Sequence, residues 1–167
     1  MMRGIDTIAG ESVEAILLDN VRVQIDRRST TIGGTWQGKT AGGTPCPWDM
    51  ESLRFFYERA CEHPEPFVLD IGANTGIYCL LPAANPNVKG IAFEPNPDAY
   101  RLLQSNLRLN GLEGHIRTLP VALSNESGSV TLKIPASGVD SGLANIGTPK
   151  RFDRWQEVCV PTDTLDN

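Results

Sequence analysis

The chain has 167 residues, of which 40% are hydrophobic and 21% charged, and its net charge at neutral pH is −5. This length suits one globular domain with a real hydrophobic core. The acidic balance and the lack of a cluster of lysines and arginines exclude the usual footprint of a nucleic-acid-binding protein. No apolar stretch approaches about 18 residues, so we expect no membrane partner and, by default, a cytoplasmic protein.

The first segment, residues 1–48, is predicted to be a hairpin followed by a loop. An apolar run at 15–18, a turn pair and an alternating stretch at 21–25 predict two antiparallel strands. We expect this hairpin to pack on the rim of the main sheet. Residues 30–47 are rich in glycine, threonine and proline, which is typical of a long loop, with Trp36 against the body of the protein.

One motif in that loop suggests a rival function. Residues Gly33–Thr40 match the phosphate-binding pattern G-x-x-x-x-G-K-[ST] of nucleoside triphosphatases. That pattern needs a buried strand before it and a helix that starts at Lys39-Thr40. Here polar residues precede it, and the glycines and prolines that follow, up to Pro47, do not carry a helix. A P-loop-like nucleotide-binding or hydrolysing protein stays an alternative.

The four cysteines form no metal-site pattern. Zinc ligands come in pairs at short spacing, whereas the cysteines are scattered, as Cys46, Cys61, Cys79 and Cys159. We therefore expect no metal ion, and we expect reduced thiols that are mostly buried.

The second segment, residues 49–167, opens with a predicted helix. Asp49 can cap it. Its apolar side chains recur at helical spacing on one face, which we expect to be core. They are Leu53, Phe56, Tyr57 and Ala60.

The central motif is a strand that ends in a glycine turn. The run Phe67–Asp70 is apolar up to its last residue, and Ile71-Gly72-Ala73-Asn74-Thr75-Gly76 follows it, which predicts a buried strand, a tight turn and a helix start. Gly72 permits unusual dihedral angles, and Gly76 permits close approach of a ligand or of the sheet. We expect a short helix after the turn, which Pro82 and Pro86 should stop or kink.

The next strand, 88–93, leads to Glu94. A carboxylate at this place, about 20 residues after a glycine turn, can accept hydrogen bonds from both ribose hydroxyls of an adenosine. A dinucleotide would need a glycine at the position of Asn74, which disfavours a pyrophosphate. S-adenosylmethionine, an adenosine with a small zwitterionic tail, fits better. Asp70 would anchor the turn or the ammonium group, and Pro95 would lie beside the adenine.

The remaining elements continue the alternation. Asn96 should cap a crossover helix that begins at Pro97. A third strand, 116–122, bent at Pro120, should bring Ala122 to the adenine edge. An alternating strand at 129–134 and a loop at 137–147 follow.

These observations define one candidate site. The predicted cofactor-binding residues are Asp70, Gly72, Ala73, Asn74, Gly76, Glu94, Pro95, Asn96 and Ala122.

Five motifs, in this order along the chain, resemble those of the FkbM family of S-adenosylmethionine-dependent O-methyltransferases. They are Leu69–Gly76, Phe93–Pro97, Asn106–Gly111, Val121–Ser124 and Thr164–Asp166. The resemblance implies an α/β, Rossmann-like class I methyltransferase sheet and transfer of a methyl group to a hydroxyl of a small molecule or sugar. A non-catalytic domain that binds an adenosine cofactor is a further alternative.

Members of this family continue beyond the last motif. We therefore expect an incomplete sheet, with its first three parallel strands plus hairpins. One edge of strand 67–70 would be apolar and unpaired, which makes oligomers through that edge an expectation. The catalytic residue is unassigned, with Asp163 and Asp166 as candidates for a general base.

Overall fold

The computed structural model describes residues 12–19, 21–30, 36–135 and 155–166. The elements in chain order are strands β1 (Ser12–Leu18) and β2 (Val21–Asp26), the 3₁₀ helix η1 (Arg27–Thr30), strands β3 (Gly38–Lys39) and β4 (Pro45–Cys46), helix α1 (Met50–Cys61), strand β5 (Phe67–Ile71), the 3₁₀ helix η2 (Tyr78–Ala83), strand β6 (Lys89–Phe93), helix α2 (Pro97–Leu109) and strands β7 (Ile116–Leu119), β8 (Ala122–Leu123), β9 (Gly128–Pro135) and β10 (Trp155–Asp163).

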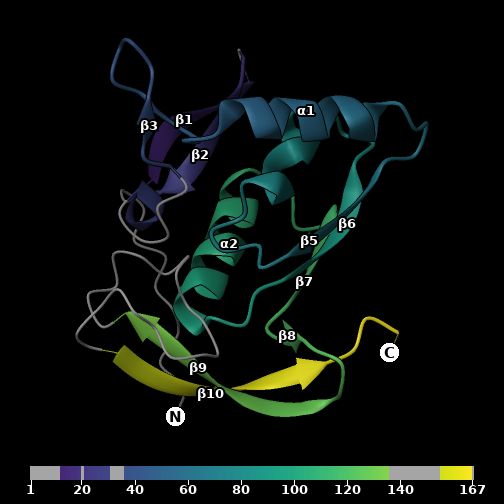
Figure 1. Ribbon diagram of the computed structural model, residues 1–167. Helices are drawn as coiled ribbons and strands as arrows, with labels where there is room; N and C mark the ends of the chain where they lie inside the picture. Colours follow the sequence, from purple (N-terminus) through teal and green to yellow (C-terminus); the bar gives the residue numbers. More distant parts are fainter. Residues whose placement is uncertain (1–11, 20, 31–35, 136–154, 167) are drawn as a thin grey trace.

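The central sheet has three parallel strands in the order β5-β6-β7 (Figure 1). Gly90 of β6 lies so close to β5 that a Cβ there would be 2.3 Å from the Val68 carbonyl oxygen. Helix α2 forms the crossover from β6 to β7. The three parallel strands predicted from the sequence are thus confirmed, in a mixed α/β architecture.

Helix α2 has the predicted start. The Asn96 side chain accepts a hydrogen bond from the backbone N–H of Asp98 at 3.1 Å, and Pro97 occupies the first turn. Leu103 and Leu107 are buried in the main core. Gly111, with φ +67°, follows the helix end, as expected for a residue in the left-handed region.

Helix α1 begins where the sequence predicts, because Asp49 accepts a hydrogen bond from the backbone N–H of Ser52 at 3.0 Å. Its apolar face is less buried than expected. Leu53 is buried, whereas Phe56 is exposed on one side and contacts Tyr78 edge to face, at 5.0 Å between ring centroids. Helix α1 therefore packs shallowly on the body of the protein.

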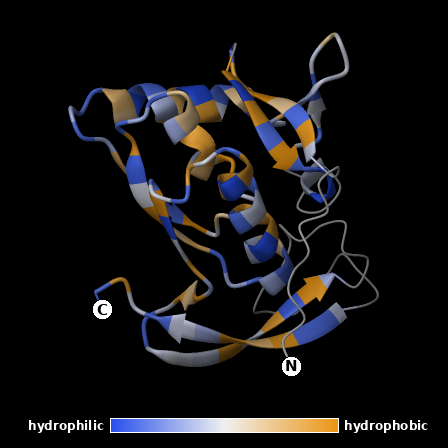
Figure 2. Ribbon diagram, turned by 180° about the vertical axis from the view of Figure 1, so that it is seen from behind, coloured by the Kyte–Doolittle hydropathy of each residue, from blue (hydrophilic) through white to orange (hydrophobic). Residues whose placement is uncertain are grey.

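The predicted N-terminal hairpin is confirmed as the antiparallel pair β1-β2. We expected the hairpin to pack on the rim of the parallel sheet, and this expectation is wrong. Strand β2 packs against α2 and η2, and the buried side chains of both strands belong to the main core. Figure 2 shows how much of this hairpin is hydrophobic, which explains why its apolar side chains are buried in the main core.

The strand predicted at 116–122 is confirmed only over Ile116–Leu119, which form β7. The chain leaves the parallel sheet after β7, passes Pro120, and enters a second sheet as β8, in the order β8-β10-β9. Strand β10 is parallel to β8 and antiparallel to β9. This sheet lies at the bottom of Figure 1 and has its own small apolar cluster. Proline lacks the N–H that a continuing ladder needs, so the strand divides there.

The predictions for two smaller features have different outcomes. The short helix after the turn is confirmed as η2, which contains Pro82 and ends at Ala83, before Pro86. Of the four cysteines, Cys46 and Cys79 are buried but Cys61 and Cys159 are exposed. Trp36 is buried, as expected, and the predicted loop at 137–147 lies outside the described residues.

One face of the parallel sheet is open. In β5, Val68 is buried, whereas Phe67, Leu69 and Ile71 are 63%, 41% and 59% exposed. These three side chains alternate with the buried side, so they share one face. Within the described ranges, β5 pairs with β6 alone and leaves its other edge unpaired. No helix in the described part of the chain has the length and apolar character needed to cross a membrane.

An open apolar strand at a sheet edge is a template for self-association. We expect Leu69→Lys to reduce the concentration-dependent light scattering of the protein with little loss of thermal stability, because the side chain is exposed. Lys133→Leu, on another sheet, serves as a comparison that adds no charge to β5. Unchanged scattering of Leu69→Lys would contradict this role of β5.

Candidate functional site

The site is built around a carboxylate between two backbone segments. Glu94 follows β6 and is 6% exposed. Its Oε2 accepts a hydrogen bond from the backbone N–H of Asn74 at 2.7 Å, and its Oε1 accepts one from the backbone N–H of Asn96, also at 2.7 Å. One side chain therefore joins the glycine turn after β5 to the start of α2.

The amides of the turn are directed into the protein. The N–H groups of Gly72 and Ala73 both donate to the Phe93 carbonyl, at 2.8 and 3.0 Å, and the N–H of Gly76 donates to the Ala73 carbonyl at 2.8 Å. Phosphate-binding loops work by directing such N–H groups at the ligand. In this turn the N–H groups instead donate to β6 and to the turn itself, which argues against a phosphate ligand.

The glycine turn has left-handed backbone conformations at three positions. The φ angles are +79° at Gly72, +52° at Asn74 and +88° at Gly76. A Cβ on Gly72 would meet no atom within 4 Å, whereas a Cβ on Gly76 would lie 2.4 Å from Leu103 Cδ1. Gly76 thus lets α2 approach, and the open space lies in front of Gly72.

Asp70 points to the covered side of the sheet. Its Oδ2 accepts a hydrogen bond from the Cys79 thiol at 3.3 Å. Burial raises the pKa of Asp70, and the bond from Cys79 lowers it in part. Burial and the neighbouring Asp70 carboxylate raise the pKa of Cys79 well above its usual range, so this thiol is a donor and not a nucleophile.

The pKa of Glu94 is raised as well. Burial raises its pKa, the two backbone N–H groups oppose that shift, and the charge of Asp70 adds to it. Two carboxyl groups with raised pKa values therefore lie around one turn. Such a pair favours the approach of a positively charged group.

Asn96 carries an unsatisfied donor at this place. It is 1% exposed, and its Nδ2 has no hydrogen-bond partner among the described residues. Buried polar atoms without partners are uncommon in folded proteins, and one beside a candidate site suggests an unseen acceptor. Pro95, next to it, is half-buried.

The structure brings eight of the nine predicted site residues together at the carboxyl ends of β5 and β6. They are Asp70, Gly72, Ala73, Asn74, Gly76, Glu94, Pro95 and Asn96. The ninth, Ala122, opens β8 in the second sheet and packs in the apolar cluster with Leu132 and Val160. The binding role of each of these residues stays a prediction.

The rival phosphate motif lacks its structural context. Gly33, Gly34 and Thr35 lie outside the described residues. Lys39 lies in the two-residue strand β3, which pairs with β4, and the Gly43 N–H donates to the Thr40 carbonyl in a turn. Within the described part of the loop no helix begins at Thr40, so no helix N-terminus faces a phosphate there.

Sequence reasoning missed the residue that supports the turn from behind. Asn106, in the middle of α2, donates a hydrogen bond from Nδ2 to the Thr75 carbonyl at 2.7 Å. The available signal was the presence of Asn106 and Asn110 on one helix face, because asparagine is a poor residue for a helix interior.

One comparison with known proteins finds a methyltransferase. No family model matches the chain. Over 77 residues the chain is 36% identical to the methyltransferase sdnD of Sordaria araneosa, a match that covers 46% of this chain and 30% of that protein. The chain thus spans less than a third of the length of this relative. The relationship supports the coarser part of the predicted resemblance, a methyltransferase, and leaves the FkbM family as a prediction.

A solved structure gives a weaker likeness. The transferase candidate PH0793 of Pyrococcus horikoshii aligns with a TM-score of 0.39 and 14% identity, over 76% of this chain and 55% of its own. This score is too low to carry an argument.

The two glycines of the turn should respond differently to alanine. We expect Gly72→Ala to cost about 1–2 kcal/mol, from the left-handed backbone alone, and Gly76→Ala about 2–4 kcal/mol, because its methyl group also displaces buried Leu103. Urea unfolding of the two variants measures the difference. Equal losses would show that contact with α2 is not what requires Gly76.

The raised pKa of Asp70 predicts a pH-dependent gain for Asp70→Asn. A carboxyl group whose pKa is raised by folding destabilises the protein as pH rises through that value, and costs nothing below the unfolded value of about 3.9. Asp70→Asn should therefore stabilise the protein at pH 7 and lose this advantage toward pH 4, as measured by thermal melting at several pH values.

Asp26 provides the control of opposite sign. Burial raises its pKa, but hydrogen bonds and the charge of Arg28 lower it further than burial raises it. Asp26→Asn should therefore destabilise the protein more at pH 7 than at pH 4. If the thermal stability of the two variants, relative to the wild type, changed with pH in the same direction, the opposite pKa shifts of Asp70 and Asp26 would be contradicted.

Proposed function

We propose that this chain binds S-adenosylmethionine and serves in the transfer of its methyl group to a hydroxyl of a small molecule or sugar. The observation that carries the proposal is the Glu94 carboxylate, which joins the turn of residues 72–76 to the start of α2 through the N–H groups of Asn74 and Asn96. The methyltransferase relative supports the class of reaction. A Rossmann-like class I sheet belongs to the same proposal.

The polar atoms of the site suit an adenosine. A carboxylate has about four acceptor positions, and the two backbone N–H groups use one on each oxygen of Glu94. The remaining positions match the two hydroxyls of a ribose. The unpartnered Nδ2 of Asn96 is a donor for an acceptor atom of the sugar or the base.

The rest of the cofactor matches the turn. The backbone at Gly72 has no side chain, and the space beside it is open, which permits an amino-acid tail to lie against it. Asp70 and Glu94 supply negative charge close to the turn. A sulfonium and an ammonium group both carry the opposite charge, whereas a pyrophosphate does not.

When bound, S-adenosylmethionine supplies a methyl group that is activated for displacement. The chain's part is to hold the donor, to orient it toward the acceptor and to keep water away. A hydroxyl acceptor also needs a group that takes its proton. Of the two candidates, Asp163 accepts hydrogen bonds from the Ser127 hydroxyl and the Thr164 N–H, which assigns it a structural role at the end of β10.

Calorimetric titration with S-adenosylhomocysteine, NAD and ATP tests the proposal. We expect binding of S-adenosylhomocysteine only, and about 10- to 100-fold weaker binding by Glu94→Gln, because an amide replaces a charged acceptor of hydrogen bonds. Glu113→Gln is the matched control, since Glu113 is an exposed acid paired with Arg108; its affinity should equal that of the wild type.

The same titrations separate the alternatives. If the chain binds ATP and Lys39→Ala abolishes this binding, the hypothesis of a P-loop-like site at Gly33–Thr40 replaces the proposal. Binding of S-adenosylhomocysteine without transfer of a labelled methyl group to any hydroxyl acceptor would favour a non-catalytic adenosine-cofactor-binding domain.

A further inference from the structure

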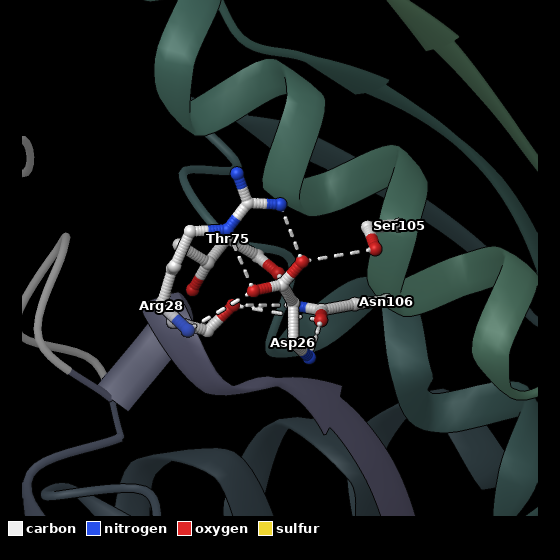
Figure 3. Close-up of polar contacts among 6 residues, drawn as sticks. Asp26, Arg28, Thr75, Ser105 and Asn106 are labelled. Carbon is white, nitrogen blue, oxygen red and sulfur yellow. Dashed lines mark hydrogen bonds and ion pairs between the residues drawn. The ribbon is translucent and has the colours of Figure 1, made fainter. Parts of the chain in front are cut away.

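A buried asparagine joins three segments that lie far apart in the sequence (Figure 3). Asn106 on α2 is fully buried. Its Nδ2 donates to the Thr75 carbonyl at 2.7 Å and to the Ser29 hydroxyl at 3.0 Å, and its Oδ1 accepts from the backbone N–H of Asp26 at 2.8 Å. One carboxamide thus contacts the glycine turn and the end of the N-terminal hairpin.

The contact falls at the least favourable part of the turn. Thr75 is buried between Asn74 and Gly76, and both of these neighbours have positive φ angles. A left-handed conformation at a residue other than glycine costs about 1–2 kcal/mol, so this backbone needs support from outside. Glu94 holds the Asn74 N–H on one side, and Asn106 holds the next carbonyl on the other.

The hairpin end that contacts Asn106 is itself fixed. The buried carboxylate of Asp26 accepts hydrogen bonds from the Arg28 backbone N–H at 3.0 Å, from its Nε at 2.9 Å and from its terminal nitrogen at 2.7 Å, and from the Ser105 hydroxyl at 3.3 Å. The Ser105 bond ties the Asp26 side chain to α2, where the Asp26 N–H meets Asn106, and the three Arg28 bonds fix the chain that follows Asp26. The hairpin is therefore docked through the same amide that supports the turn.

We propose that Asn106 is a positioning residue, which sets the conformation of the glycine turn and makes the hairpin a working part of the ligand site. This inference rests on the proposed function only for the identity of the ligand. Asn106 touches no ligand in this role. It acts through the carbonyl of Thr75, and docking of the hairpin and ordering of the turn are coupled.

Asn110 offers a matched control one helical turn further on. Its Oδ1 accepts from the Gln24 N–H at 2.9 Å, and its Nδ2 donates to the Gln24 carbonyl at 2.7 Å and to the Asn106 carbonyl at 2.7 Å. It therefore ties the same hairpin to the same helix, but its hydrogen bonds to described residues do not reach residues 72–76. Loss of Asn110 therefore removes one link between β2 and α2, and leaves both the contact of Asn106 with Asp26 and the support of Thr75 in place.

The experiment compares Asn106→Ala with Asn110→Ala in the intact chain. Hydrogen exchange of the amides at residues 72–76 is measured first, in the absence of ligand, and the affinity for S-adenosylhomocysteine is then measured well below the melting temperature. We expect both variants to melt earlier. Only Asn106→Ala should exchange these amides faster and bind about tenfold or more weakly, as for a lost hydrogen bond to a constrained group.

A smaller change keeps the test decisive if Asn106→Ala does not fold. Asp26→Asn removes the charge that holds Arg28 but keeps the backbone N–H that donates to Asn106 Oδ1. We therefore expect a modest rise in hydrogen exchange of the amides at residues 72–76. If the amides at residues 72–76 exchange no faster in Asn106→Ala, or in Asp26→Asn where Asn106→Ala does not fold, than in Asn110→Ala, the positioning role is overturned. If Asn106→Ala exchanges these amides faster but the wild-type protein binds no S-adenosylhomocysteine, the positioning role is upheld and the proposed function is overturned.

Discussion

The candidate site depends on one buried carboxylate that receives two backbone N–H groups. Burial of the Glu94 carboxylate is unfavourable, and it raises the pKa of this group. The two N–H groups offset part of it, because they donate to the charged form. In return the turn after β5 and the first residues of α2 are held at a fixed separation. Every other feature of the site is arranged around this link between β5, β6 and α2.

Local sequence signals predicted the elements that make this link. The caps at Asp49 and Asn96 are properties of a few neighbouring residues, so the two helix starts were readable. The glycine turn was readable too, because Gly72 and Gly76 both require positive φ. The sequence therefore predicted which residues lie at this edge of the sheet, because the carboxyl ends of parallel strands bring them together. Their binding role stays a prediction.

What the sequence did not reveal depends on long-range packing. A strand of residues 116–122 was expected because its side chains are typical of strands, but which sheet a strand joins depends on partners elsewhere, here β10. The same holds for the hairpin, which packs on α2 and η2 and shares one hydrophobic core with them. The second buried support of the turn, Asn106, lies in one of the five motifs, and its place in a helix interior is the one local signal of a special role. The sequence does not show which role, since the partners of Asn106 lie 31 and 80 positions away.

The charges around the turn limit the chemistry that the site favours. A ligand that brings phosphate would add negative charge beside Asp70 and Glu94, where burial already raises both pKa values and the charge of Asp70 adds to the shift of Glu94. It would also find the N–H groups of Gly72 and Ala73 bonded to the Phe93 carbonyl. A cationic, adenosine-like ligand meets neither obstacle, because its positive charge lowers both pKa values and its hydroxyls need acceptors rather than donors. The electrostatics and the hydrogen-bond inventory of the turn therefore favour the same class of cofactor by independent routes.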